Sequence, residues 1–207
     1  MLLALAAMIE SSTAHADAQT WSEFDLVTSV GPRTELNVAL LERWDLDERD
    51  AVTSAVGVDA SVKVATHLTL TGSYYYASSR TSSGRWIDSH LPVLAATLAM
   101  DAAPCVFSNR TRAVGVITEG RDFWVYQNRP RLDCRLPAAL RGASVFLWDE
   151  LSYYTLFDDW TRNRLAAGIR VPLGKRYLLD IYYLRQHDLR ARSANTDVIG
   201  ITFGWRL

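Results

Sequence analysis

Arginine residues recur two positions apart at several places in this sequence. Such pairs are Arg110 and Arg112, Arg129 and Arg131, and Arg162 and Arg164. Residues two apart lie on the same face of a β-strand, so each pair would place two guanidinium groups side by side. Guanidinium groups form forked, directional bonds with carboxylates and other oxyanions. The chemistry that this spacing suggests is therefore ion pairing or anion binding.

The full candidate set comprises the arginines and carboxylates that alternation places on the polar face of the expected strands. Its members are Arg43, Asp59, Arg110, Arg112, Arg129, Arg131, Glu150, Arg162, Arg164 and Arg170, with Glu23 and Asp25 as further acids. Two roles remain open for this set. The groups form either a salt-bridged plug that gives a narrow lumen its shape, or a positive constriction that passes or binds small anionic solutes.

Asp88 and His90 suggest a different chemistry, because they too share one strand face and have serines nearby. A carboxylate that orients a histidine beside a hydroxyl group is the arrangement used in acyl transfer, so a lipid hydrolase is an alternative function. The histidines and cysteines are not spaced as metal ligands, and no glycine-rich phosphate loop is present. We expect no metal, no cofactor and a non-enzymatic role.

Alternating strands must position these residues, and the clearest strand is the end of the chain. Its apolar face carries Ile199, Ile201, Phe203, Trp205 and Leu207, and its other face carries Val198, Gly200, Thr202, Gly204 and Arg206. Similar alternation recurs along the chain, and no segment longer than a turn keeps a helical period. One apolar face and one small or polar face is the pattern of a strand between lipid and a lumen. The sequence therefore predicts an all-β fold, a transmembrane β-barrel in a bacterial outer membrane.

Aromatic residues and connection lengths support this interpretation. Tryptophans and tyrosines gather beside the longer connections, among them Trp44, Trp86, Trp124 and Trp160, where a membrane interface favours such rings. The shorter connections alternate with the longer ones, as in barrels with tight periplasmic turns. A soluble periplasmic β-barrel binding protein would also alternate, and it remains the third alternative.

The strand count is harder to settle. The pattern yields eleven segments, with both the first and the last running away from the outer rim. Because single-chain bacterial barrels have even strand numbers, we expect a single antiparallel barrel of about 12 strands, with about 10 as the alternative.

The N-terminus and the two cysteines point to export. Residues 1–18 combine an apolar core with small residues at two candidate cleavage sites, which predicts a signal peptide ahead of a barrel over residues 19–207. Cys105 and Cys134 lie symmetrically about the centre of an expected hairpin, which places them opposite each other. We expect a cross-strand disulfide, with two free thiols as the alternative because pairing depends on the exact register.

Several short motifs resemble a known family. They are Ser108-Asn109-Arg110-Thr111-Arg112, Asn128-Arg129-Pro130-Arg131-Leu132, Asp149-Glu150-Leu151, Asn163-Arg164-Leu165 and Tyr182-Tyr183-Leu184-Arg185-Gln186. In this order they resemble a bacterial domain-of-unknown-function family (number twenty-four-ninety), and the similarity covers most of the chain after residue 18. The resemblance implies an outer-membrane β-barrel and no established activity, substrate or cofactor. Ser89-His90-Leu91-Pro92 departs from the more polar, arginine-containing pattern of similar proteins.

Charge and composition bound the partners. The 207 residues carry a formal net charge of −1, so no large positive field marks a nucleic-acid partner. We expect the partners to be outer-membrane lipids, the barrel-assembly machinery and small anionic solutes, and we expect a monomer. The role predicted is a structural protein or a narrow pore for small solutes.

Overall fold

The computed structural model describes residues 17–81, 83–137, 140, 142–189 and 195–207. Most of the predicted signal peptide lies outside these residues, and the first strand begins at Asp17. Within the described residues, no helix is long and apolar enough to cross a membrane.

Eleven strands form the described part of the chain. They are β1 (Asp17–Gly31), β2 (Thr34–Asp45), β3 (Asp50–Ala65), β4 (Leu68–Arg80), β5 (Trp86–Ala102), β6 (Cys105–Thr118), β7 (Arg121–Arg135), β8 (Ser144–Tyr154), β9 (Asp159–Leu173), β10 (Tyr177–Asp188) and β11 (Asn195–Arg206). Each strand pairs with the next, and β1 pairs with β11 to close the sheet into a barrel. The all-β barrel fold is therefore confirmed.

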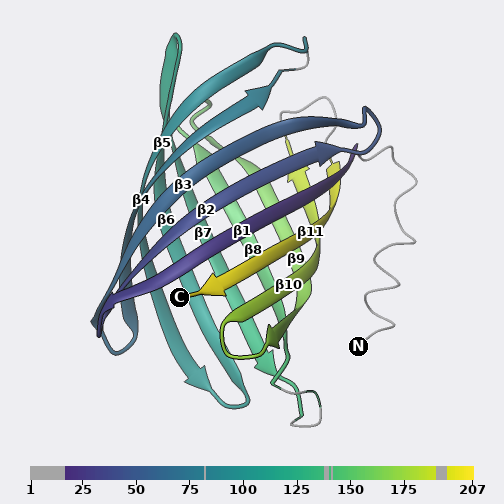
Figure 1. The fold of residues 1–207 in the computed structure, drawn as a ribbon. Coiled ribbons are helices and arrows are strands. Elements are labelled where there is room, and N and C mark those ends of the chain that lie inside the picture. Colours follow the sequence, from purple (N-terminus) through teal and green to yellow (C-terminus); the bar gives the residue numbers. More distant parts are fainter. Residues whose placement is uncertain (1–16, 82, 138–139, 141, 190–194) are drawn as a thin grey trace.

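The closure of the barrel corrects both the strand number and the strand directions. The described residues contain eleven strands rather than about 12 or about 10, and the barrel is mixed rather than wholly antiparallel. Strands β1 and β11 run in the same direction with Ser22 opposite Ile201 and Phe24 opposite Phe203 (Figure 1). An odd number of up-and-down strands leaves the first and last parallel, and parallel pairing satisfies their backbone groups as well.

The parallel seam can be tested with a pair of cysteines. Ser22 and Ile201 are register partners across β1 and β11, so Ser22→Cys with Ile201→Cys should form an intramolecular disulfide. Gel mobility before and after reduction measures the cross-link. Ser22→Cys combined with Val58→Cys on β3 is the control and should remain unlinked. A disulfide in the control pair, together with no disulfide between positions 22 and 201, would contradict the parallel closure.

The outward faces of the strands are apolar and carry two aromatic belts. One belt lies near the ends where β2 joins β3, β4 joins β5 and β8 joins β9, and its exposed members include Trp44, Tyr74, Tyr76, Trp124, Tyr126 and Trp160. The other lies near the opposite end, where Phe203 on β11 stacks with Phe24 on β1 and Tyr177 on β10 across ring-centroid distances of 5.9 and 5.8 Å. The outer wall thus has an apolar band between two rows of rings.

Inside the barrel, an apolar cluster fills the side formed by β8 to β11. The buried residues Phe146, Trp148, Ala166, Leu184 and Val198 pack together, with Trp21 and Tyr182 against them. Glycines make room for the inward rings, since Tyr75 lies over Gly57 and Tyr182 lies over Gly200. The remaining inward positions of the described strands are largely polar, and they form the candidate site.

Candidate functional site

Glu150 is the centre of the polar lumen. It lies on β8, is fully buried, and is surrounded by four arginines from three strands. The guanidinium groups of Arg129, Arg164, Arg110 and Arg112 lie 2.8, 3.4, 3.5 and 3.6 Å from its carboxylate oxygens. We call these five residues the Glu150 cluster. Register explains the convergence, because Arg110 is opposite Arg129 on the β6–β7 pair and Glu150 is opposite Arg164 on the β8–β9 pair.

Neutral side chains complete the cluster. Gln127 donates from Nε2 to Glu150 Oε1 at 3.4 Å and to Ser152 Oγ at 3.1 Å, and it accepts a hydrogen bond from Arg112. The guanidinium carbon of Arg129 lies 4.1 Å from the ring centroid of Trp148, which adds a cation–π contact. These contacts fix the arginine heads in the lumen.

Positive charge exceeds negative charge in the Glu150 cluster. Four arginines face one carboxylate, which leaves three positive charges uncompensated within the cluster. Glu23 on β1 interacts electrostatically with Arg129 and Arg110 and offsets one of them. The Arg110 Nε group is buried with no hydrogen-bond partner. The cluster therefore carries excess positive charge and one buried donor, Arg110 Nε, without an acceptor, whereas a closed salt-bridge network would have paired both.

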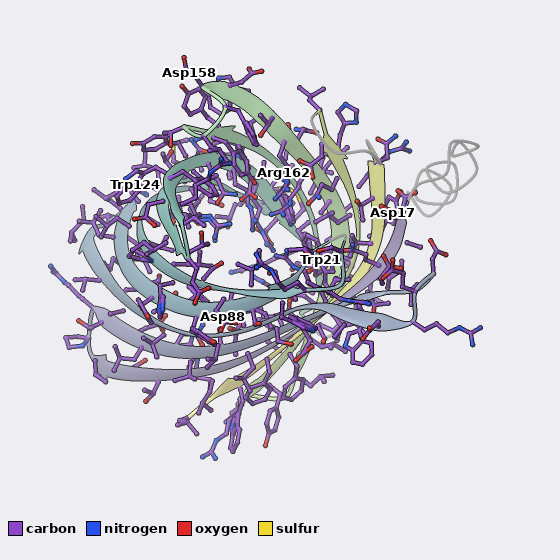
Figure 2. All side chains as sticks on the ribbon, turned by 90° about the horizontal axis from the view of Figure 1, so that it is seen from above. Asp17, Trp21, Asp88, Trp124, Asp158 and Arg162 are labelled. Atoms are coloured by element: carbon purple, nitrogen blue, oxygen red, sulfur yellow. A yellow bond between two sulfur atoms is a disulfide. The ribbon has the colours of Figure 1, made fainter. Side chains whose placement is uncertain are left out.

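One further arginine, Arg43, extends the positive surface along the inner wall. Arg43 on β2 lies over the Trp21 ring at 4.1 Å, and Arg164 approaches the same ring at 5.1 Å. Figure 2 looks down the barrel and shows Trp21 and Arg162 inside the ring of strands, with Trp124 and Asp158 at its outer edge. Trp21 thus links Arg43 to the Glu150 cluster.

The other predicted arginines form local pairs with aspartates. Arg131 binds Asp133 and Arg170 binds Asp180, each through two hydrogen bonds of 2.7 and 2.8 Å. Arg162 binds Asp188 at 2.9 Å. Each of these three pairs has one positive and one negative charge. The pairs therefore help to fill the lumen and contribute little net electrostatic field.

Asp59 lies apart from the arginines. Asn37 on β2 donates to Asp25 and Asp59 at 2.9 and 3.0 Å, and the Tyr75 hydroxyl donates to Asp59 at 2.8 Å. The structure therefore does not bring Asp59 into the Glu150 cluster. Within the described residues, no group of three or more histidine, cysteine or acidic residues could hold a metal ion.

Asp133, Asp180 and Asp188 are lumen residues that the sequence reasoning missed. Asp133 lies two positions from Arg131, which the sequence already assigned to the inward face. Asp180 and Asp188 lie on the polar side of β10. Asp180, for example, lies between Leu179 and Ile181, which belong to the predicted apolar face of β10. Strand parity would have found Asp133 and Asp180, whereas Asp188 lies in a segment that the sequence assigned to a polar loop and that the structure includes in β10.

Asp88 and His90 lie on the outward face of β5. The His90 Nδ1 atom lies 2.5 Å from the Tyr74 hydroxyl oxygen, and its ring packs against Tyr76. Asp88 interacts through hydrogen bonds with Ser78 and Tyr76. Ser78 therefore binds the Asp88 carboxylate, whereas activation of a hydroxyl group for acyl transfer requires a hydrogen bond from the serine to the histidine.

Cys105 and Cys134 form a disulfide at the end of the β6–β7 hairpin. They are register partners in this pair, with Cα atoms 4.0 Å apart. The symmetry of the hairpin about its connection therefore placed them correctly.

Comparison with known proteins gives a family match and distant structural likenesses. A family described as "Protein of unknown function (DUF2490)" matches residues 18–197. Solved structures with a similar fold include an anion-selective porin from Comamonas acidovorans, at 14% identity and a TM-score of 0.44, covering 86% of this chain and 54% of the porin. Another is the outer-membrane expressed OmpT of Vibrio cholerae, at 7% identity and a TM-score of 0.40, covering 79% of this chain and 58% of the other. This chain thus spans little more than half the length of either protein. No curated protein matches the sequence.

Proposed function

The chain belongs to the DUF2490 family, and from this premise we propose that it is an outer-membrane β-barrel protein whose lumen binds or passes small anionic solutes. The excess of positive charge in the Glu150 cluster is the observation that carries this proposal. A plug needs as many carboxylates as guanidinium groups, as in the Arg131–Asp133 and Arg170–Asp180 pairs. The Glu150 cluster has spare cations, which favour an anion in the lumen.

The outer wall supports a membrane location. Large apolar side chains on the outward faces are substantially exposed, for example Leu94 at 71%, Val58 at 53% and Ile199 at 49%. A soluble barrel would leave these side chains in water, at a cost of about 25 cal/mol per Å² of apolar surface. Lipid removes this cost, and the two aromatic belts match the two membrane interfaces. We place the ends where β2 joins β3 and β4 joins β5 at the outer rim.

Membrane fractionation tests the location. Cells that express the full chain should yield the protein in the outer-membrane fraction, with a mobility on gels that changes on heating. Recovery of the folded protein from the soluble periplasm would contradict the membrane proposal and would favour a periplasmic binding protein.

Ion selectivity tests the role of the Glu150 cluster. Arg110 and Arg112 make its longest ion pairs, so Arg110→Gln with Arg112→Gln removes two positive charges while Arg129 and Arg164 still bind Glu150. One charge about 4 Å from a passing anion contributes about 1 kcal/mol even at the dielectric constant of water. We expect the anion-to-cation permeability ratio to fall at least about fivefold, measured as the reversal potential across planar bilayers in a salt gradient.

A charge-neutral change in the same lumen is the matched control. Arg170→Gln with Asp180→Asn removes one balanced pair, so the permeability ratio should stay at the wild-type value. Equal losses in both double variants would show that selectivity does not depend on the Glu150 cluster. Insertion of the wild-type protein without measurable current would contradict passage of solutes.

A further inference from the structure

Five polar side chains form a patch on the outer wall of the barrel. They are Asn109 and Thr111 on β6, Asn128 on β7, Asp149 on β8 and Asn163 on β9. Each is the chain neighbour of a residue in the Glu150 cluster, and successive residues of a strand face opposite sides. The same stretches of sequence therefore supply the charged lumen and this outward surface, which we call the outer polar patch.

The outer polar patch lies within the apolar band. Asp149 is at the centre of β8 (Ser144–Tyr154), between the outward residues Leu147 and Leu151, each 46% exposed. Asn109 lies two residues from Phe107, which is exposed near the start of β6, and Asn128 lies two residues from Tyr126, which belongs to the aromatic belt at the other end of the wall. If the barrel spans a membrane as proposed, these polar groups face the hydrocarbon region and not a headgroup layer.

The middle of β2 and β3 is apolar by comparison. The outward residues at the middle of β2 and β3 are Leu36, Val38, Leu40, Val56, Val58 and Val62, all exposed. A polar or charged group on the lipid-facing side is costly near the midplane, because lipid tails offer no hydrogen bonds. Polar residues gathered on one side of the wall therefore indicate a surface that is not covered by lipid tails.

Hydrogen bonds within the patch satisfy only part of its polar groups. Asn163 donates to Asp149 Oδ1 at 2.6 Å, and Asn128 donates to Thr111 at 2.9 Å. The Asn109 Oδ1 atom is buried and has no partner. Pro130, which has no N–H group, lies where the pairing of β7 with β8 is interrupted between Asn128 and Arg131. Each of the two hydrogen bonds uses one of the two hydrogens of an amide group, and the first uses one of the two carboxylate oxygens of Asp149, so the patch keeps donors and acceptors beyond these two bonds.

We propose that the outer polar patch is the interface through which two copies of this chain form a dimer in the membrane. The proposal rests on the membrane location proposed above, and it replaces the expectation of a monomer. Two copies inserted in the same direction are related by a two-fold axis along the membrane normal, so each residue meets residues at its own depth. Asparagine amides both donate and accept, which makes a patch rich in them complementary to itself.

The geometry of the patch places this axis between β7 and β8. Asn128 is the register partner of Leu151, so Asp149 is its diagonal neighbour, two residues along β8. An axis between these two residues turns Asn128 of each copy towards Asp149 of the other, and an amide-to-carboxylate hydrogen bond then forms twice across the interface. Hydrogen bonds to an ionised acceptor are stronger than neutral ones. The second copy thereby supplies donors to Asp149 at a depth where neither water nor lipid supplies them.

Cross-linking in intact outer membranes tests the interface. Asn128→Cys should be joined to its counterpart by a short bismaleimide, which doubles the apparent mass on a denaturing gel. The native Cys105–Cys134 disulfide leaves no other thiol in the chain. Val58→Cys is the matched control, since Val58 is also outward and within the apolar band but lies on β3. It should remain at the single mass.

A second variant distinguishes a dimer from a monomer through the mass of the assembly and its resistance to heat. Asn128→Leu with Asp149→Leu removes polar groups from the wall, so it should halve the mass of the native assembly measured by mass spectrometry from membranes or nanodiscs. For a monomer surrounded by lipid, the same change would leave the mass unaltered and raise the resistance to heat, which would overturn the proposal. Wild-type protein of single mass, or a cross-link from Asn128 to a different protein, would also overturn it.

The two proposals fail in distinguishable ways. Fractionation of the same cells reports the location, and cross-linking reports the dimer. Soluble protein would contradict the membrane location itself. Membrane-bound protein in which Asn128→Cys and Val58→Cys react alike would contradict the dimer and leave the location intact.

Discussion

Replacing Glu150 with glutamine should destabilise the barrel by about 3–5 kcal/mol, because it leaves buried arginines without their common counterion. The side chain of Glu150 is fully buried, and it is the carboxylate shared by all four arginines of its cluster. Glutamine keeps the size but replaces one accepting oxygen with a donating NH₂ group that faces guanidinium donors. Urea titration of the protein in lipid vesicles, followed by tryptophan fluorescence, measures the free energy of unfolding.

The same substitution at an exposed pair is the control. Glu35 binds Arg206 at 2.6 Å, but the side chains are 46% and 55% exposed, so Glu35→Gln should cost less than about 1 kcal/mol. Removing Arg129 together with Glu150, as Glu150→Gln with Arg129→Gln, should recover part of the loss because the two residues are coupled. If Glu150→Gln and Glu35→Gln had the same free energy of unfolding, the negative charge of Glu150 would not be required to stabilise the buried arginines.

The faces of the strands could be predicted from sequence because a period of two is unambiguous once one face is apolar. Alternation alone assigned Ile199 and Ile201 to the apolar face and Glu150 to the lumen, and the structure places them there. The partners within the lumen could not be predicted in this way. Which arginine reaches Glu150 and which reaches Asp133 or Asp180 depends on register and on the stagger between strands, which are properties of the closed barrel.

The strand number was wrong for a different reason. The sequence pattern contained eleven segments with the first and last pointing the same way, and the structure has both features. The prediction of an even number came from a rule about other barrels. Parallel pairing of Asp17 to Val27 with Thr196 to Arg206 gives the odd barrel a closed ladder without an additional strand.

The outward polar residues were visible in sequence but could not be interpreted there. Asn128 and Asp149 occupy positions that strand parity assigns to the apolar face, and a single polar residue in such a row is weak evidence. Only the register of three neighbouring strands shows that Asn109, Asn128 and Asp149 are close together. A surface built from several strands is therefore a product of the fold and not of any one segment.

Replacing Gly168 with alanine should be the most damaging single-methyl change in the wall, at about 1–3 kcal/mol. A Cβ atom at this position would lie 2.6 Å from the Ile181 carbonyl oxygen, from Phe146 Cζ and from Tyr182 Cβ. The carbonyl belongs to the β10 backbone, and Gly168 is the register partner of Tyr182, so relief requires β9 and β10 to move apart. The measurement is again the free energy of unfolding in vesicles.

Gly72 is the matched control, because it lies in β4 and a Cβ atom there would have nothing within 4 Å. Gly72→Ala should be neutral or stabilise by about 0.5–1 kcal/mol, since alanine loses less backbone freedom on folding. The two variants add the same methyl group to a strand of the barrel, on the inward face at Gly168 and on the outward face at Gly72, and only at Gly168 is a neighbouring strand in the way. A Gly168→Ala protein as stable as Gly72→Ala would mean that the β9–β10 ladder can widen at little cost, and that Tyr182 is not held tightly between Gly168 and Gly200.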